Sequence, residues 1–490
     1  MLKKHFTCFI RWVLQWIRLH KLLSLAGKLV STSTIPRPLL SALQKIASCF
    51  SLVKNSCGLV TLPQEVLEMI LAELDWKDVL RVRATCKLLC DASRSRSVWR
   101  IQYQRLSDSY DTPLKAKDGT ATYSELEDDT LHWARVQRDW VYPSKRPTQR
   151  LVGRCPGLQM RLLEGGRWLL TNSNFLHPGC LSAYDLDTTN GRHRILIHPQ
   201  DKREHRIETF AIEEVNTLPK IEVFVALVRE HPDEQFARLS FWKVTNSLDE
   251  TLIARHITSF NTYVDDISHV KDLRGDYFAR FAVPYTSGPL HIDVYDWRRS
   301  CSLTHHKATI ILRERLCTIR ILPGQRILGL DKQTVRIYDM PNCRPVPAKC
   351  PVAALPTAPL HTLALPGLNP YVYTPLYFNL LGNAHFYVAS TEAVVKLTIP
   401  HDGQPLTGED YIRHSPGDRC AYAFSLHRAY FRRLSTRKVL SFSRYYDERC
   451  IKTWEASEEH NYGWRPLLDD FSGRVIERAD DEYISVLDHN

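Results

Sequence analysis

The chain has 490 residues, of which 44% are hydrophobic and 24% charged, a composition that excludes a largely disordered protein and is typical of folded soluble ones. The net charge of +11 is misleading, because residues 1–64 contain nine basic residues and no acidic one. Without these nine, 56 of the 65 basic residues face 54 acidic residues, so the body of the chain does not indicate a general nucleic-acid-binding surface.

Residues 1–58 form a basic, acid-free leader in which Arg11 and Arg18 interrupt an apolar series. These interruptions argue against a secretory signal, and no apolar run approaches the roughly 20 residues of a membrane-spanning helix. Three interpretations stay open. The leader is a poorly ordered tail or the product of an uncertain translation start, a basic amphipathic helix on an anionic membrane surface formed by residues 1–30, or a mitochondrial transit peptide.

Residues 59–107 predict a small three-helix domain. Pro63 fits the first position of a helix and Glu65 its first turn, where the helix dipole favours an acid. Asp75 can cap a second helix, with Asp78 in the capping-box position. The apolar positions of the two helices are Val66, Leu67, Ile70, Leu71, Leu74, Val79, Leu80, Val82, Cys86 and Leu89.

A short third segment is expected to end at Val98-Trp99. The apolar stripe is too long for so small a unit to bury alone, which predicts a protein partner. A purely structural alternative is an amphipathic helical hairpin that belongs to a larger core.

The order and spacing of these residues resemble the F-box pattern, although Leu89 stands where that family often has an aromatic residue. The resemblance implies docking on a Skp-family adaptor and, through it, on a cullin–RING ubiquitin ligase. The motif residues are Leu62-Pro63, Val66-Leu67, Ile70, Leu74, Asp78-Val79-Leu80, Cys86-Lys87 and Val98-Trp99. The residues expected to bind the adaptor, or to support that contact, are Leu62, Pro63, Val66, Leu67, Ile70, Leu74, Leu80 and Trp99.

Residues 108–142 predict a helical linker, with a helix over Tyr123–Tyr142 that Pro143 ends. Residues 131–140 are similar to the helix that follows the F-box in many fungal F-box proteins.

Residues 143–490 predict an all-β domain, because short alternating apolar runs are separated by turn residues. One pattern, in which an apolar strand ends in an aromatic or apolar residue that an aspartate usually follows, recurs roughly every 40–60 residues, as propeller blades do. Its copies begin at Leu181, Leu239, Ile292, Val335 and Ile484, with weaker ones at Val395 and Val439.

The seven copies favour a β-propeller of six or seven blades, which we describe as WD-like because the Gly-His element of WD repeats is absent. The last copy lies where a ring closed by a shared strand needs one. A β-sandwich pair or an irregular β domain is the alternative. Residues 291–297 and 468–475 resemble segments of the C-terminal part of fungal F-box proteins, which implies an F-box joined to a propeller-like domain.

No catalytic, metal or cofactor motif is present: the sequence has no Gly-x-Ser-x-Gly, His-Glu-x-x-His or P-loop, and its 13 cysteines lack zinc spacing. The odd number of cysteines, without a secretory signal, favours reduced thiols in the cytosol or nucleus. We interpret Gly165-Gly166 as a hairpin turn, His305-His306 as a solvated loop, and the acid pairs at 265–266 and 469–470 as loop acids or caps.

The sequence therefore predicts an α+β multidomain protein that acts as the substrate-recognition subunit of an SCF-type ubiquitin ligase, without enzymatic activity or cofactor. Its expected partners are the adaptor with its cullin and a protein substrate, and no nucleic acid. The alternative is a non-catalytic propeller scaffold held on a membrane by the basic leader. A cytoplasmic or nuclear location is expected, with mitochondrial or membrane-surface targeting as alternatives set by the leader.

Overall fold

The computed structural model describes residues 62–110, 121–141, 148–154, 159–173, 179–188, 192–199, 207–216, 221–230, 236–247, 249–263, 266–283, 289–347, 355–373, 376–378, 383–390, 393–413, 420–424, 428–433, 438–443, 452–455, 467–469, 472–478 and 483–488. The predicted leader, residues 1–58, lies outside the described residues. The chain divides into two compact units, Met1–Ser95 and Arg96–Asn490, which we describe separately.

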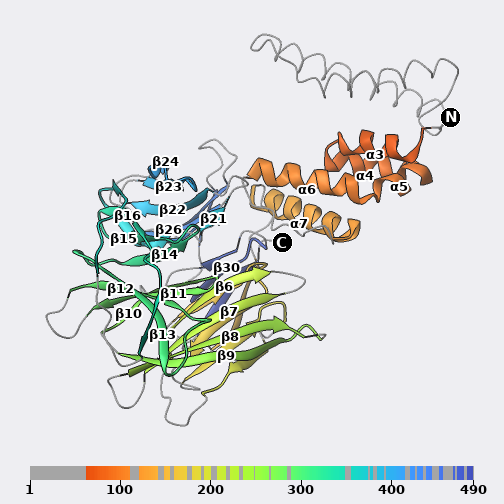
Figure 1. The fold of residues 1–490 in the computed structure, drawn as a ribbon. Coiled ribbons are helices and arrows are strands. Elements are labelled where there is room, and N and C mark those ends of the chain that lie inside the picture. The colour runs from red at the N-terminus through yellow and green to blue at the C-terminus, as the bar shows by residue number, and fades with distance from the viewer. Residues whose placement is uncertain are drawn as a thin grey trace, which may run out of the picture. The chain divides into compact units, whose positions relative to one another are not determined.

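The first unit contains three short helices, α3 (Gln64–Ala72), α4 (Trp76–Arg83) and α5 (Lys87–Ser93), and both α3 and α4 lie against α5 (Figure 1). Pro63 is the N-cap residue of α3 and not its first helical residue, one position earlier than predicted. Its carbonyl accepts the first helical hydrogen bonds, at 3.1 Å from the amides of Val66 and Leu67. Asp75 caps α4 as predicted, with its carboxylate 3.3 Å from the amide of Lys77.

The prediction of one long second helix is wrong, because the segment forms α4 and α5 with a break between them. The hydroxyl of Thr85 donates to the carbonyl of Val82 at 2.7 Å, and so does its amide at 3.1 Å. Such local bonds satisfy the last carbonyls of a helix and compete with its continuation. Cys86 then takes an extended backbone, with φ −159°, as the N-cap residue of α5.

The second unit begins with two longer helices, α6 (Arg96–Tyr110) and α7 (Tyr123–Val141), which pack against each other. The predicted third F-box segment does not end at Trp99, since α6 starts three residues earlier and continues to Tyr110. The helix predicted over Tyr123–Tyr142 is confirmed as α7, which ends one residue earlier. A reciprocal capping box opens it: the amide of Thr122 donates to Glu125 at 2.8 Å, and the amide of Glu125 donates to the Thr122 hydroxyl at 3.3 Å.

The described strands form seven sheets that are antiparallel apart from one short parallel pair. The first sheet contains β2 (Met160–Leu162), β3 (Trp168–Ser173), β4 (Cys180–Asp185) and β5 (Arg192–Ile197). The second contains β6 (Ile207–Asn216), β7 (Glu222–Glu230), β8 (Phe236–Asn246) and β9 (Leu252–Tyr263). The third contains β10 (Asp266–Arg274), β11 (Tyr277–Val283), β12 (His291–Asp296), β13 (Thr304–Ile311), β17 (Arg344–Pro347) and β18 (Leu355–Pro356).

The other sheets come later in the chain, except that the chain returns to the third sheet for β17 and β18 before it completes the fourth. The fourth contains β14 (Thr318–Leu322), β15 (Arg326–Leu330), β16 (Thr334–Asp339) and β19 (His361–Ala364). The fifth contains β20 (Leu368–Tyr373), β21 (Tyr377–Phe378), β22 (Ala384–Ser390), β23 (Ala393–Ile399) and β24 (Thr407–Arg413). The sixth contains β25 (Cys420–Phe424), β26 (Arg428–Arg433), β27 (Lys438–Ser443) and β28 (Lys452–Glu455).

The seventh sheet joins the two ends of the β region. It contains β29 (Leu467–Leu468), β30 (Val475–Arg478), β31 (Tyr483–Asp488) and, beside β31, the first strand of the region, β1 (Thr148–Arg154). The register runs from Thr148 opposite Asp488 to Arg154 opposite Tyr483. The last described strand, β31, therefore pairs with the first strand of the β region, β1, as well as with β30. The last copy of the repeat predicts a strand at this position.

The sequence repeat and the sheets coincide. Each of the seven copies of the predicted pattern lies on a different sheet, on its third strand in hydrogen-bonded order when the seventh sheet is counted from β29: β4, β8, β12, β16, β23, β27 and β31. The residue after the aspartate also has a common role, because the amides of Leu186, Trp297 and Met340 each donate to a carbonyl in the preceding hairpin turn of their sheet, at 2.8–3.0 Å. The repeat therefore marks one structural position.

The core lies between neighbouring sheets. One apolar cluster joins the β2–β5 and β6–β9 sheets, another joins β6–β9 to the sheet of β10–β13, and further clusters continue to the β14 and β20 sheets. β25 lies beside both β20 and β29, and a last cluster joins the β29–β31 sheet to β2–β5. Buried on both faces, strands such as β4 expose none of their six residues.

Candidate functional site

Helix α3 carries three of the eight residues predicted to bind an adaptor, and the structure divides the eight into two groups by burial. Leu67 is fully buried in the described structure, as is Trp99 of α6. These two side chains hold helices in place and offer no surface to another protein. The other predicted residues are half-buried or exposed: Leu62, Pro63, Val66, Ile70, Leu74 and Leu80.

The most exposed apolar side chain of α3 is one that the sequence interpretation left out. Met69 has 57% of its surface exposed and lies three positions after Val66 and next to Ile70. Its spacing from Val66 was the available signal, because residues three apart share a helix face. A solvent-exposed methionine beside partly exposed aliphatic side chains gives α3 an adaptable apolar surface.

Polar contacts fix α3 to the end of α5. The hydroxyl of Ser95 donates to the carboxylate of Glu68 at 2.6 Å, across 27 positions of sequence. Arg83 of α4 donates to the hydroxyl of Ser93 at 2.8 Å, and Ser93 is fully buried. Asp78 and Arg81 form an ion pair at 2.7 Å on the solvated side of α4. The apolar surface of α3 is thus carried by a unit whose helices are joined by polar contacts.

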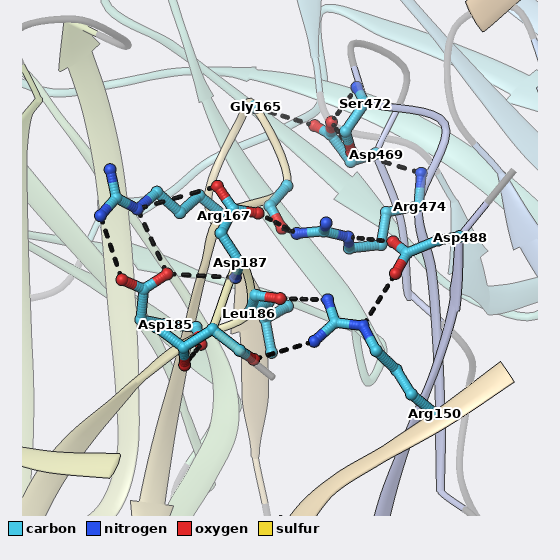
Figure 2. Close-up of polar contacts among 12 residues, drawn as sticks. Arg150, Gly165, Arg167, Asp185, Leu186, Asp187, Asp469, Ser472, Arg474 and Asp488 are labelled. Atoms are coloured by element: carbon cyan, nitrogen blue, oxygen red, sulfur yellow. Dashed lines mark hydrogen bonds and ion pairs between the residues drawn. The ribbon is translucent and has the colours of Figure 1, made fainter. Parts of the chain in front are cut away.

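A second cluster of functional-looking residues surrounds the junction of β1 and β31, and Figure 2 shows that its charges are paired. Arg150 and Arg474 donate to the two carboxylate oxygens of Asp488 at 2.8 and 2.6 Å. Arg474 also reaches Asp187 at 3.0 Å and the carbonyl of Gly166 at 2.6 Å. Arg150 donates to the carbonyl of Leu186 as well.

Next to it, Arg167 forms a bidentate pair with Asp185 at 3.0 and 3.2 Å and reaches Glu250 at 2.6 Å. The carboxylate of Asp185 with that of Glu250 raises the pKa of Arg167, against the opposing effect of burial. Each arginine in this cluster has a carboxylate partner. The arrangement fits a structural clasp.

Most of the remaining predicted features have simple structural roles. Gly165 and Gly166 form the β2–β3 hairpin turn with positive φ angles of 93° and 70°, as predicted. Asp469 caps the following turn, accepting from the amide of Ser472 at 2.6 Å and from the amide of Gly165 at 3.1 Å. Of the other acid pair, Asp266 begins β10 and residue 265 lies outside the described residues.

The interpretation of His305-His306 as a solvated loop is wrong. Both residues lie within β13, and His305 is 4% exposed, between the rings of Phe260 and Tyr295. Burial, with nearby Lys307 and Arg280, lowers the pKa of His305 to about 4, so the ring is neutral at physiological pH.

Asp293 lies at the centre of the same buried region. It is fully buried and accepts from Lys307 at 2.8 Å and from Arg280 at 3.2 Å. Burial by itself would raise the pKa of Asp293, but these two cations hold it well below its usual range. The carboxylate therefore stays charged and acts as a structural counter-ion.

The described residues form neither a metal site nor a membrane-spanning helix. Within the described ranges, no three or more His, Cys, Asp or Glu side chains are grouped so as to hold a metal ion. None of the helices that the structure describes is long and apolar enough to cross a membrane.

Comparison with known proteins gives one informative result. Residues 59–105 match the F-box-like family model. No curated protein matches the chain. Among solved structures, the chain is similar to one from Bacteroides uniformis that is named as a 6-phosphogluconolactonase, at 12% identity and a TM-score of 0.28, with 65% of this chain and 77% of that chain covered. The chain thus carries an F-box-like domain, and α3 with its exposed apolar surface lies inside the match.

Proposed function

We propose that this protein is the substrate-recognition subunit of an SCF-type cullin–RING ubiquitin ligase, with the F-box-like domain docked on a Skp-family adaptor. The observation that carries the proposal is the F-box-like match over residues 59–105, which coincides with helices that leave Met69 and Ile70 partly exposed. A cluster of exposed apolar side chains on a small helical unit is typical of a protein-binding surface.

Such a subunit needs no catalytic residues of its own. It holds the substrate near the transferring enzyme and raises their effective concentration, so that binding alone accelerates the reaction. The paired charges around Asp488 and the buried counter-ion Asp293 are consistent with a protein that works by binding.

The substrate would be held by the β region, which we propose to be a closed, WD-like propeller of seven blades. Three observations support this: seven sheets follow one another along the chain, apolar clusters or strand contacts join neighbouring sheets, and the first strand pairs with the last. In a ring closed by a shared strand, the first and last sheets are joined, so the row of sheets has no exposed end.

Adaptor capture by the full chain tests the F-box function. Ile70→Asp and Met69→Asp each place a charge on the apolar surface of α3, which would cost several kcal/mol if the adaptor covers it. We expect both variants to lose co-purification with the Skp-family adaptor while their thermal unfolding stays unchanged. Lys332→Asp, at an exposed position outside the F-box-like match, is the control and should retain it. Undiminished capture by both α3 variants would refute docking through this helix.

A tethered scaffold is the second candidate, favoured by the nine basic residues and the absence of acids in residues 1–64. It would place the protein on an anionic membrane, whereas the ligase function alone is compatible with the cytoplasm or nucleus. Liposome flotation of the intact chain and of a chain beginning at Leu59 separates the two. Flotation that is lost on truncation supports tethering, and flotation of neither chain removes it.

A further inference from the structure

The last strand of the second sheet, β9, pairs with a described strand along only one of its two edges. β9 pairs with β8 on one side and lies at the end of the sheet (Figure 1). With 12 residues it is the longest described strand, and no described strand pairs with its other edge. The corresponding edge of β13 is covered by the chain itself, through β17 and β18. A long unpaired edge is a template for another strand.

The exposed face of β9 has a defined pattern of side chains. Leu252 belongs to the core shared with the β2–β5 sheet, and Ala254 packs against that core. The alternate residues therefore lie on the opposite face, where Ile253 is 48% exposed and Arg255 is exposed. Ile257 follows at 40% exposure, at a bulge that shortens the regular stretch to Leu252–His256.

The edge is also positively charged. β9 contains no acidic residue, and Arg255 has no ion-pair partner among the described residues. Its cross-strand neighbour Lys243 already holds the nearest carboxylate of the ladder, Glu222, at 2.7 Å.

The neighbouring strand β5 strengthens this charge. β5 lies beside β9 and contains no acid either. Its Arg194 is exposed and has no ion-pair partner in the described part of the chain. Arg194 pairs across the strand with Ala183, whose side chain belongs to the core shared with the β6–β9 sheet, so Arg194 lies on the face turned toward β9. A segment that approaches this edge therefore meets positive charge from two sheets.

We propose that the free edge of β9 binds an extended, acidic segment of the substrate as an added strand. In an added strand, residues two apart share a face, so an acidic side chain opposite Arg255 would place an apolar side chain opposite Ile253. Main-chain hydrogen bonds to β9 would supply the affinity. The acidic and apolar side chains of the added strand, opposite Arg255 and Ile253, would supply the specificity. This inference rests on the proposed function, because it names the class of segment that the substrate receptor recognises.

Fluorescence polarisation with the full chain tests the proposal directly. The probe is a labelled peptide, Thr-Val-Thr-Glu-Thr-Val-Thr, and the comparison peptide has lysine in place of glutamate. We expect binding of the glutamate peptide, and a loss of at least about tenfold in affinity for Arg255→Glu, since like charges replace the attraction. The lysine peptide should gain affinity for the same variant. Arg313→Glu, at an exposed arginine between β13 and β14, should change neither.

Two results would overturn the proposal. One is that neither peptide binds, or that Arg255→Glu leaves the affinity unchanged. The other is that Arg255→Glu makes the chain self-associate in light scattering without affecting peptide binding, because Arg255 would then protect the edge against a second copy. Adaptor capture by Arg255→Glu is measured in parallel, so that failure of the peptide site and failure of the ligase function are distinguishable.

Discussion

Replacing Arg474 with methionine is expected to destabilise the β-rich unit by about 3 kcal/mol. The side chain of Arg474 is 13% exposed and connects three parts of the chain, through Asp488 at 2.6 Å, Asp187 at 3.0 Å and the carbonyl of Gly166 at 2.6 Å (Figure 2). Methionine fills much of the same volume, so the change removes the charge and the hydrogen bonds and leaves little cavity.

The expected loss of unfolding free energy follows from the contacts that the partners of Arg474 keep after the substitution. Removing one member of a buried ion pair costs roughly 3–5 kcal/mol when the other charge is left alone. Asp488 retains Arg150 at 2.8 Å, which places the cost at or below the low end of that range. The lost bond to the Gly166 carbonyl adds on the order of 1 kcal/mol. Together these give about 3 kcal/mol.

Urea unfolding of the full chain, followed by tryptophan fluorescence, measures the change, and Arg299→Met is the matched control. Arg299 pairs with Asp296, which occupies the position in its sheet that Asp488 occupies in the last sheet. Its side chain is 73% exposed and the pair is 3.4 Å long, so we expect a loss of at most about 1 kcal/mol. Equal losses for the two variants would refute the idea that the ion pairs clasp the first and last strands.

Three further predictions concern single residues. The pKa of His305 is lowered to about 4 from an ordinary value near 6.5, so the folded protein should lose stability as pH falls from 6.5 to 4, by about 3 kcal/mol in total. In urea unfolding at several pH values, His305→Gln should flatten this pH dependence. Gly166→Ala should lower the melting temperature more than Gly275→Ala. Both glycines have positive φ, but a Cβ at Gly166 would clash with the side chain of Ser472, whereas Gly275 faces open space. Leu67→Ala should cost about 2–5 kcal/mol of helix stability by circular dichroism, because Leu67 is core and not surface; an unchanged melting curve would contradict its burial.

The helices show where sequence periodicity is sufficient and where it fails. Periodicity and caps located α3 and α7, because those signals act within a few residues of the chain. The break between α4 and α5 was not predicted, because the apolar spacing continues across it. Only the hydrogen bonds of Thr85 to Val82 reveal the turn. The spacing of apolar residues also cannot distinguish buried positions from exposed ones. Leu67 and Ile70 belong to the same apolar stripe, but only the first is fully buried.

The β region shows the same division at a larger scale. The repeated apolar strand that an aspartate usually follows was visible in the sequence, and each copy lies on a different sheet. His305 was misassigned because polarity suggests a loop, whereas its ring is enclosed by Phe260 from another sheet. The free edge of β9 was not foreseen either, because an unpaired edge depends on which strands lie beside it.

The sequence by itself determined the F-box-like segment, the change from helices to strands and the number of strand repeats, since each of these depends on residues close together in the chain. The tertiary structure alone decided which apolar residues of α3 stay exposed and which edge of a sheet stays open. It also decided that Arg150 and Asp488, 338 positions apart, form an ion pair. Such contacts depend on how whole sheets pack, and no local spacing of residues encodes that packing.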